Sequence, residues 1–309
     1  MKKILITGAS GFIGGSTAIR LKELGHTVVG IDLVTRKHLT KYFDMFCCGD
    51  YVDMLKPEFA NHNFSHIIHC AGTSLVHPSF IDPSQYYVNN VAKTIELIDW
   101  IKNYSPSTQI IFSSSASVYK TNKEVLNEED ELEPLSPYAK TKKMIEDVIF
   151  DVHVSNNLNF TVFRYFNACG ALGSEHGQEP NATHIFPRLF ETRRYGGLFT
   201  QYGDSTRDYI HIRDIVDAHV QAINNSTVGV FNLGNRHGYK SSEIINWFVK
   251  KIGDLNIAIM PKRKGEADRL VADITRANYV LKWNPRHDID DVLIDLRRWY
   301  DSDNYKEQR

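Results

Sequence analysis

The sequence predicts an α/β protein, with a doubly wound parallel sheet and a smaller mixed α/β lobe toward the C-terminus. Short β-branched runs alternate with amphipathic helical patterns over the first half of the chain. Such alternation is typical of parallel strands joined by crossover helices. A glycine-rich turn follows the first strand, and a long polar segment begins after residue 166. Long polar loops in compact domains are usually functional, and the mixed elements after this break predict a second, less regular lobe.

The strands of the main sheet are predicted from short apolar runs, and its helices from apolar residues at helical spacing. Gly25 directly follows the first helix, at a position where glycine commonly ends a helix. The predicted strands cover residues 3–7, 27–31, 66–70, 109–114 and 159–166, and the predicted helices cover residues 12–24, 86–104 and 138–154.

The elements after the polar segment 167–184 are shorter and of mixed type. We expect residues 1–166 to form the main domain, with residues 209–235 returning to it. Residues 167–208 and 236–309 would then form the lobe. The predicted helices lie near 184–195, 213–224, 241–252 and 289–300, and the predicted strands near 199–202, 209–212 and 230–234.

The composition excludes several classes of protein. The chain has 309 residues, with 36 Lys and Arg against 37 Asp and Glu, so nothing indicates a nucleic-acid or anionic-membrane partner. Its four cysteines form no CxxC pair, which argues against a zinc site or a disulfide framework. The apolar run at the N-terminus is too short for a signal peptide, and no run approaches membrane-spanning length. We therefore expect a cytoplasmic protein without a bound metal.

The stretch "TGASGFIG" (7–14) joins the first strand to the first helix and contains Gly8, Gly11 and Gly14. In a Rossmann-type unit, such glycines allow a sharp turn, a close approach to a pyrophosphate and close packing of helix on strand. A plain glycine-rich turn would look similar in isolation. At the start of a βαβ unit, however, the pattern predicts a dinucleotide site.

The acidic residue at the end of the second strand suggests which dinucleotide is bound. Asp32 could accept hydrogen bonds from the adenosine ribose, and it would repel a 2′-phosphate, so it favours NAD over NADP. Arg36 and Lys37 follow and could argue the reverse, but we expect them in a solvated loop. Asp50 is a candidate contact for the adenine amino group, or else an ordinary surface carboxylate.

"SPYAKTK" (136–142) places Tyr138 and Lys142 one helical turn apart, on one face of the predicted helix. An amphipathic helix could have this spacing by chance. However, Ser115 in "FSSSASVYK" lies at the carboxyl end of a strand, where open α/β sheets bind ligands. A nearby ammonium and the positive nicotinamide would favour the phenolate, so the three residues predict proton transfer at a hydroxyl group.

The order of these motifs resembles the extended short-chain dehydrogenase/reductase family over nearly the whole chain. "GFIG", "SSSASVY", "SPYAKTK", "RYFNACGA" and "RDYIHIRDIVDAHV" are most similar to the members that act as UDP-glucose (UDP-galactose) 4-epimerases. The resemblance implies Tyr138, Lys142 and Ser115 as catalytic residues and a UDP-sugar as substrate. It also implies that NAD contacts Gly8, Gly11, Phe12, Ile13, Gly14, Asp32, Asp50, Tyr51, Ala71, Gly72, Asn89, Ser113, Tyr138, Lys142 and Tyr165. Implied substrate contacts are Ser74, Ser115, Tyr138, Asn167, His184, Thr200, Tyr202, Arg207, Arg263 and Leu270.

The implied reaction inverts C4 of a UDP-hexose through a 4-keto sugar, while Arg207 and Arg263 hold the diphosphate. Related 4,6-dehydratases carry an Asp-Glu pair after the catalytic Ser or Thr, but this chain has Ala116 and Ser117 there. Two departures leave the sugar open. Ser74 replaces a common lysine, and the segment between Tyr202 and Arg207 is short. The alternatives are a UDP-N-acetylhexosamine or UDP-hexuronate 4-epimerase and, in another class, a non-catalytic NAD-binding regulator.

A homodimer is also expected. The predicted helices 86–104 and 138–154 carry apolar residues on more than one side, which exceeds what one sheet face needs. The family resemblance implies that these two helices form a four-helix interface. Coverage of the extra apolar residues by loops is the alternative.

Overall fold

The protein is seen in a computed structural model that describes residues 1–180, 182–263 and 265–308, so residue 181 of the predicted polar segment lies outside the described residues. Its main sheet has seven parallel strands in the order β10-β6-β5-β4-β1-β2-β3. The strand order changes direction beside β1, which is where sheets of this kind bind ligands. The strands are β1 Lys3–Thr7, β2 Thr27–Asp32, β3 Met45–Cys48, β4 His66–His69, β5 Gln109–Ser115, β6 Phe160–Tyr165 and β10 Gly229–Leu233.

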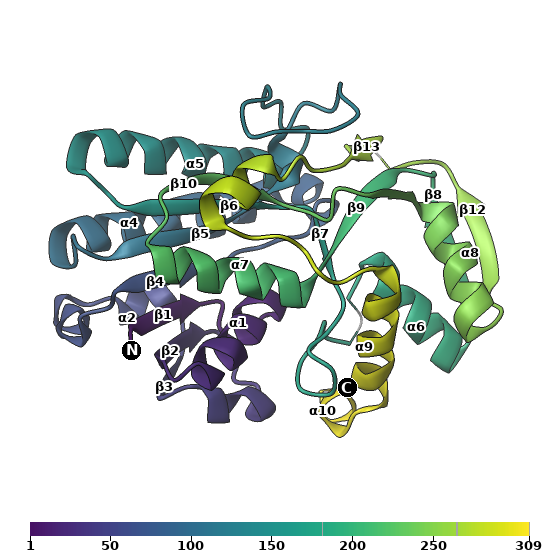
Figure 1. Cartoon of the computed structure of the whole chain (residues 1–309), viewed down its shortest axis with the longest axis horizontal. Coiled ribbons are helices and arrows are strands. Elements are labelled where there is room, and N and C mark those ends of the chain that lie inside the picture. The colour runs from purple at the N-terminus through teal and green to yellow at the C-terminus, as the bar shows by residue number, and fades with distance from the viewer. Residues whose placement is uncertain (181, 264, 309) are drawn as a thin grey trace.

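Helices cover both faces of this sheet (Figure 1). α1 (Phe12–Glu23) and α7 (Ile212–Asn225) pack together on one face. α4 (Lys93–Tyr104) and α5 (Pro137–Asn156) pack on the other. Because both faces are covered, most residues of β1, β4, β5 and β6 are fully buried, as expected for parallel strands. The predicted doubly wound parallel sheet is confirmed.

Two details of this half differ from the prediction. β3 was missed, because it is an edge strand whose "MFCC" residues are mostly half-buried or exposed and show no run of buried apolar residues. The helix predicted over 86–104 is present but irregular, because α3 (Pro83–Tyr86) continues through a π-helical turn over Tyr87–Ala92 into α4. In that turn Asn90 is buried, and its amide contacts the backbone of Thr73 at 2.8 and 2.9 Å.

The C-terminal elements form a lobe at the carboxyl edge of the main sheet, on the right of Figure 1. Strand β9 pairs with β7, β11 and β13, while β8 pairs with β12. Aromatic residues such as Phe190, Phe248 and Trp299 fill a separate core here. The elements are β7 Asn167–Cys169, α6 Ile185–Tyr195, β8 Leu198–Tyr202, β9 Thr206–His211, β11 Gly238–Lys240, α8 Ser241–Ile252, β12 Asn256–Met260, β13 Arg269–Leu270, α9 Ile289–Asp301 and α10 Asp303–Lys306.

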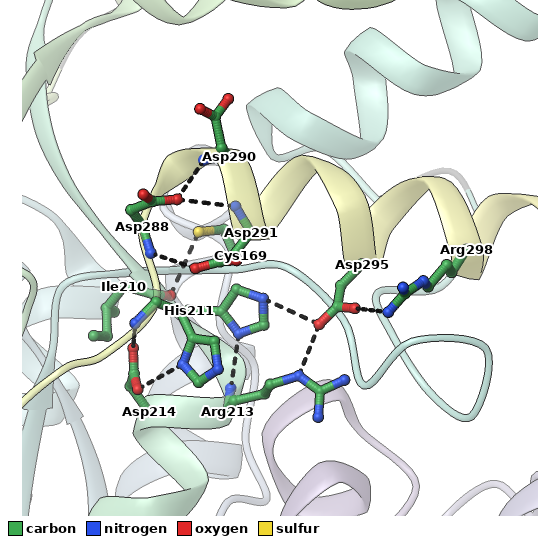
Figure 2. Close-up of polar contacts among 11 residues, drawn as sticks. Cys169, Ile210, His211, Arg213, Asp214, Asp288, Asp290, Asp291, Asp295 and Arg298 are labelled. Atoms are coloured by element: carbon green, nitrogen blue, oxygen red, sulfur yellow. Dashed lines mark hydrogen bonds and ion pairs between the residues drawn. The ribbon is translucent and has the colours of Figure 1, made fainter.

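A polar cluster around buried His211 and Asp295 joins this lobe to the start of α7 (Figure 2). The Arg213 guanidinium donates to Asp295 of α9 at 2.7 Å, and Nε2 of His211 lies 3.5 Å from the same carboxylate. His211 ends β9, so the cluster fixes the end of the strand that also carries Arg207. Because β7 pairs with β9, the cluster also fixes Asn167.

The remaining helical elements are short. No helix within the described ranges is both long and apolar enough to cross a membrane. The short elements are α2 Tyr51–Met54, the 3₁₀ turns Lys37–Tyr42, Pro57–His62, Pro78–Phe80 and Ala116–Val118, and a π turn over Ala277–Leu281.

Candidate active site

One large cavity lies between the carboxyl ends of the main strands and the lobe, with a volume of about 1220 Å³. Its walls include residues at or just beyond the ends of β1, β2, β4, β5 and β6, together with residues of α6, β8 and β9. Every cofactor, catalytic and substrate residue that we predicted from the sequence lines this cavity. The structure therefore brings the predicted residues together, while their individual roles stay predictions.

The glycine-rich turn at one end of the cavity fits a dinucleotide. Gly8 has φ +68°, and a Cβ atom there would lie 2.6 Å from the backbone nitrogen of Ala71. A Cβ on Gly14 would lie 2.2 Å from the Gly8 carbonyl oxygen. Gly11 is the N-cap of α1 and supplies no side-chain cap, so the first amides of the helix are free to bind a phosphate group.

Asp32 lies on the cavity wall and is held in place by the glycine-rich turn. Its two carboxylate oxygens accept hydrogen bonds from the backbone N–H groups of Ser10 at 2.9 Å and Val34 at 3.0 Å. A fixed carboxylate at the end of β2 suits the ribose hydroxyls of NAD and disfavours a 2′-phosphate.

The expectation of a solvated Arg36 was wrong. Its Nε donates to the Ser10 carbonyl oxygen at 3.0 Å, and its other nitrogens bind the side chains of Glu179 and Gln308. Because Glu179 neutralises it, Arg36 does not act as a free cation for a 2′-phosphate. The neighbouring Lys37 is exposed.

Asp50 has partners that the sequence did not reveal. Its carboxylate caps α2 by accepting from the Val52 N–H at 3.2 Å, and it pairs with Lys93 of α4 at 2.6 Å. Lys93 lines the cavity as well. It lies at the first position of α4, where its charge alone gave no sign that it faces a ligand.

His176 was also missed, although it touches the glycine-rich turn. Its Nε2 lies 3.1 Å from the Gly11 carbonyl oxygen, and His176 is almost fully buried. Since a carbonyl can only accept, Nε2–H is the donor, and Nδ1 then accepts from Nε2 of His38 at 3.2 Å. A Cβ on Gly15 would lie 2.7 Å from Nε2 of His176, which explains the second glycine of "IGG".

The catalytic candidates come from β5 and α5. Ser136 caps α5 by accepting from the Ala139 N–H at 3.1 Å, which fixes the first turn and Tyr138 within it. One turn later, Nζ of Lys142 donates to the Ser113 carbonyl oxygen at 2.8 Å and lies 6.0 Å from the Tyr138 ring centroid. Ser115 is hydrogen-bonded to the Ser117 hydroxyl at 2.8 Å.

Burial dominates the acid–base properties of these groups. It raises the pKa of Tyr138, which the nearby Ser115 hydroxyl partly lowers. Burial also lowers the pKa of the Lys142 ammonium to about 8. Desolvation favours the neutral form of both groups, and the contribution of Lys142 to stabilising the phenolate stays a prediction. The positive nicotinamide is the further source of phenolate stabilisation that the expected chemistry invokes.

Tyr165 lies on the same wall, and its hydroxyl proton is held by a hydrogen bond to His219. Nδ1 of His219 contacts the Ile215 carbonyl oxygen at 2.9 Å, so it carries the ring proton, and Nε2 accepts from the Tyr165 hydroxyl at 2.9 Å. The Tyr165 oxygen in turn lies 3.2 Å from the Ser113 hydroxyl. Tyr165 is therefore held as a neutral phenol, and burial raises its pKa well above the usual range.

The lobe contributes the arginines of the opposite wall. The Arg207 guanidinium donates to the carbonyl oxygens of Thr206 at 2.9 Å and Ala267 at 2.8 Å. The Arg263 guanidinium lies 3.8 Å from the ring centroid of Tyr202. Within the described residues neither arginine pairs with a carboxylate, so the alternative of structural salt bridges finds no support.

The remaining substrate candidates are placed as follows. Leu270 is 8% exposed and pairs in register with Arg207, so the two side chains share one face of the strand pair. His184 precedes α6, and its Nδ1 accepts from the Gln178 amide at 3.1 Å. Asn167 begins β7, Thr200 and Tyr202 lie on β8, and Ser74 is an exposed residue after β4.

The short segment 203–206 is tied to the lobe. The Gly203 N–H donates to the Met260 carbonyl oxygen at 2.9 Å, and the Asp204 carboxylate accepts from the Ser242 N–H at 2.8 Å. These contacts hold the turn against β12 and the first turn of α8.

Comparison with known proteins agrees with the geometry. Residues 4–234 match the NAD dependent epimerase/dehydratase family. UDP-glucose 4-epimerase from Lactobacillus helveticus is 33% identical over 97% of both chains. UDP-glucose 4-epimerase uge1 from Schizosaccharomyces pombe is 34% identical over 96% of this chain and 93% of its own.

Solved structures give the same picture. UDP-glucose 4-epimerase from Bifidobacterium longum, in complex with NAD⁺ and UDP, superposes with a TM-score of 0.90 at 30% identity, over 96% of this chain and 98% of that one. The Stenotrophomonas enzyme, with bound NAD and formylated UDP-arabinopyranose, gives a TM-score of 0.91 at 26% identity, over 97% and 98% of the two chains.

Proposed function

The chain belongs to the NAD dependent epimerase/dehydratase family, and we propose that it is an NAD-dependent enzyme that inverts C4 of a UDP-hexose and so interconverts UDP-glucose and UDP-galactose. One observation carries the proposal. Buried Tyr138 and Lys142 share a single cavity with two arginines that have no carboxylate partner among the described residues. This arrangement supports a proton-transfer site and a diphosphate site in the same cavity.

The side chains divide the reaction between them. Tyr138 takes the proton of the sugar 4-hydroxyl as its phenolate, and Lys142 stabilises that charge. Ser115 hydrogen-bonds the same sugar oxygen. NAD, when bound, supplies the acceptor and donor of the hydride at C4. Arg207 and Arg263 hold the diphosphate while the 4-keto sugar turns to present its other face.

A dehydratase is disfavoured. Eliminating water across C5 and C6 needs a further acid and base beside the catalytic serine. The two positions after Ser115 are Ala116 and Ser117, in a 3₁₀ turn with Ala116 buried. These residues offer neither a carboxylic acid nor a carboxylate.

Product analysis tests which UDP-sugar the protein converts. Purified protein is incubated with UDP-glucose, UDP-galactose and their N-acetyl and uronate analogues, and the products are separated by chromatography. Interconversion of the two plain hexoses without added cofactor is the expected result. A redox-neutral cycle keeps NAD bound, so denatured protein should release it. Stoichiometric consumption of added NADPH would indicate a reductase instead, and inert sugars would favour a regulator.

The wider organisation is part of the proposal. Residues 1–166 and 209–235 would bind NAD, and residues 167–208 and 236–309 would bind the nucleotide sugar. α7 and β10 on the main sheet support this division, although β9 pairs within the smaller sheets. A cytoplasmic location is supported by Cys47, Cys48, Cys70 and Cys169, which are all free thiols.

A homodimer through α4 and α5 is proposed as well. Apolar side chains on these helices stay exposed in the single chain, among them Ile95, Met144, Phe150 and Val154. An apolar face shared by two neighbouring helices is typical of a protein interface. Light scattering at micromolar concentration should give twice the mass of one chain, and a monomeric mass would remove this part of the proposal.

A further inference from the structure

A third arginine, Arg188, lines the same cavity. It lies in the part beside α6, β8 and β9, which carries predicted substrate residues and which we call the substrate half. It lies in the first turn of α6, and its side chain crosses to β8. There Nη2 donates to the Thr200 carbonyl oxygen at 2.9 Å, and the guanidinium lies 4.6 Å from the Phe199 ring centroid. The side chain is thus held on the strand that also carries Tyr202.

Arg188 has no counter-charge within the part of the chain that the structure describes. Among the residues that the structure describes, no carboxylate pairs with it, and its hydrogen bond to Thr200 engages one of its three nitrogens. Burial and the positive charge of Arg263 both lower the pKa of its guanidinium. Arg188 stacks on Phe199 and Arg263 stacks on Tyr202, so both cations line the cavity along β8, and neither pairs with a carboxylate among the described residues. Two like charges on one wall are unfavourable unless a ligand relieves them.

A purely structural role explains less. A side chain that only braced α6 against β8 could do so through the single hydrogen bond and the stacking on Phe199. It would not need to face a cavity, or to approach a second arginine that stacks on Tyr202. A dianionic group between the two guanidinium groups would satisfy both.

We infer that Arg188 is a third arginine of the substrate site and binds the diphosphate of the nucleotide sugar together with Arg207 and Arg263. This inference rests on the proposed function, which supplies the nucleoside diphosphate. Arginine suits this task because its fork of donors matches phosphate oxygens. The contact is made to the part of the substrate that does not react, so it contributes equally in the ground state and the transition state.

The test is a binding measurement with ligands that differ in their phosphates. Isothermal titration with UDP, UMP and uridine is performed on the NAD-loaded wild-type protein and on Arg188→Leu. We expect UDP affinity to fall by about tenfold or more, because charge-assisted hydrogen bonds are lost. Uridine affinity should stay within about twofold. A loss that is equal for UDP and uridine would mean that the variant has disturbed the nucleoside pocket, and it would overturn the inference.

Three further variants complete the design. Arg193→Leu removes the same charge from an exposed position of the same helix, outside the cavity lining, and should bind UDP as the wild type does. Arg188→Lys should recover part of the affinity, since it keeps the charge and loses the fork. If Arg207→Leu weakens UDP binding and Arg188→Leu does not, the inference fails and the diphosphate site stands. If neither weakens it, the proposed diphosphate site itself is wrong.

Steady-state kinetics distinguish whether Arg188 binds the diphosphate or the carboxylate of a uronate sugar. If Arg188 binds the diphosphate equally in the ground state and the transition state, Arg188→Leu should raise KM with little change in kcat. The rise should be similar for UDP-glucose and UDP-glucuronate. A loss confined to UDP-glucuronate would assign Arg188 to the uronate carboxylate instead and would overturn the inference.

Discussion

The two halves of the cavity satisfy their positive charges differently. In the cofactor half, beside the glycine-rich turn, Arg36 contacts Glu179 and Lys93 pairs with Asp50. Outside the cavity lining, buried Arg164 pairs with Glu146. In the substrate half, the three arginines rest on backbone carbonyl groups or aromatic rings. The paired cations are neutralised by the protein itself, whereas the three arginines have no carboxylate partner among the described residues, which fits the ligand-binding role that we propose for them.

Lys142 refines this comparison. It lies in the cofactor half, yet its ammonium donates to a backbone carbonyl and, like the substrate-half arginines, it has no carboxylate within 4 Å among the described residues. It is also the cation to which we assign a role in the reaction. The cations to which we assign a role are therefore those without a carboxylate partner among the described residues, whichever half of the cavity they line.

The largest effect should follow from breaking a paired charge. Glu146 and Arg164 lie 2.6 Å apart, and their side chains are 2% and 4% exposed. Glu146→Ala leaves the guanidinium buried without its partner, which should lower the free energy of unfolding by about 3–5 kcal/mol. Urea denaturation followed by circular dichroism measures this loss.

A neighbouring residue on α5 supplies the control. Asp147 forms an exposed pair with Lys143 at 2.7 Å, so Asp147→Ala should cost about 1 kcal/mol or less. Arg263→Leu, which breaks no pair, should also have a small effect. Equal losses for all three variants would contradict the distinction between paired and unpaired charges.

Removing the catalytic phenol should reduce turnover without disturbing either set of charges. Tyr138→Phe is expected to lower kcat by about 10²-fold or more, because a positioned acid–base group contributes that much. NAD should stay bound, as measured by its release on denaturation. Tyr165→Phe is the matched variant on the same wall, and its loss should stay under about tenfold. A fully active Tyr138→Phe would refute the assignment of the base.

NAD should be held less tightly when the contact of His176 with the glycine-rich turn is removed. The Gly11 carbonyl accepts from Nε2–H of His176 at 3.1 Å, which orients the peptide whose N–H belongs to Phe12. His176→Leu removes this donor, so NAD should dissociate about tenfold faster.

The NAD-to-protein ratio after gel filtration measures this change. His176→Gln, which can still donate from an amide, should retain more cofactor than the leucine variant. The KM for UDP-glucose, set in the other half, should change little. Identical retention in wild type and His176→Leu would show that this contact does not hold the cofactor.

Sequence reasoning placed residues correctly where their arrangement depends on local spacing. Gly8 and Gly14 are required by a single turn, and Tyr138 and Lys142 meet because one helical turn separates them. It failed where the partner comes from a distant segment. His176 reaches Gly11 across 165 positions, and Arg188 looks like any basic residue in an amphipathic helix until the fold places it in the cavity that Arg263 also lines. Asn90 was hidden for another reason, because a π turn over Tyr87–Ala92 cannot be read from apolar spacing.

The smallest change in the main reaction is expected at Leu270, on the lobe side of the cavity wall. Leu270 lies beside Arg207 in the strand pairing and borders the cavity. From the family resemblance, a tyrosine here goes with plain hexoses and a small residue with N-acetylated ones, and leucine leaves partial room. The protein should therefore interconvert UDP-glucose and UDP-galactose efficiently, with weaker activity on UDP-N-acetylglucosamine. A pocket wall discriminates by only about 1–3 kcal/mol per methylene-sized change.

Leu270→Tyr should abolish most of the N-acetyl activity, because the phenol ring fills the space that the acetamido group needs. Its kcat/KM for UDP-glucose should stay within about twofold of the parent value. Leu270→Met, which keeps the side-chain volume, is the control and should preserve the ratio of the two activities. Chromatography of both reactions at matched enzyme concentration gives that ratio directly. If the tyrosine variant treats both sugars as the parent does, Leu270 does not contact the sugar, and the pocket wall is formed by residues outside this strand.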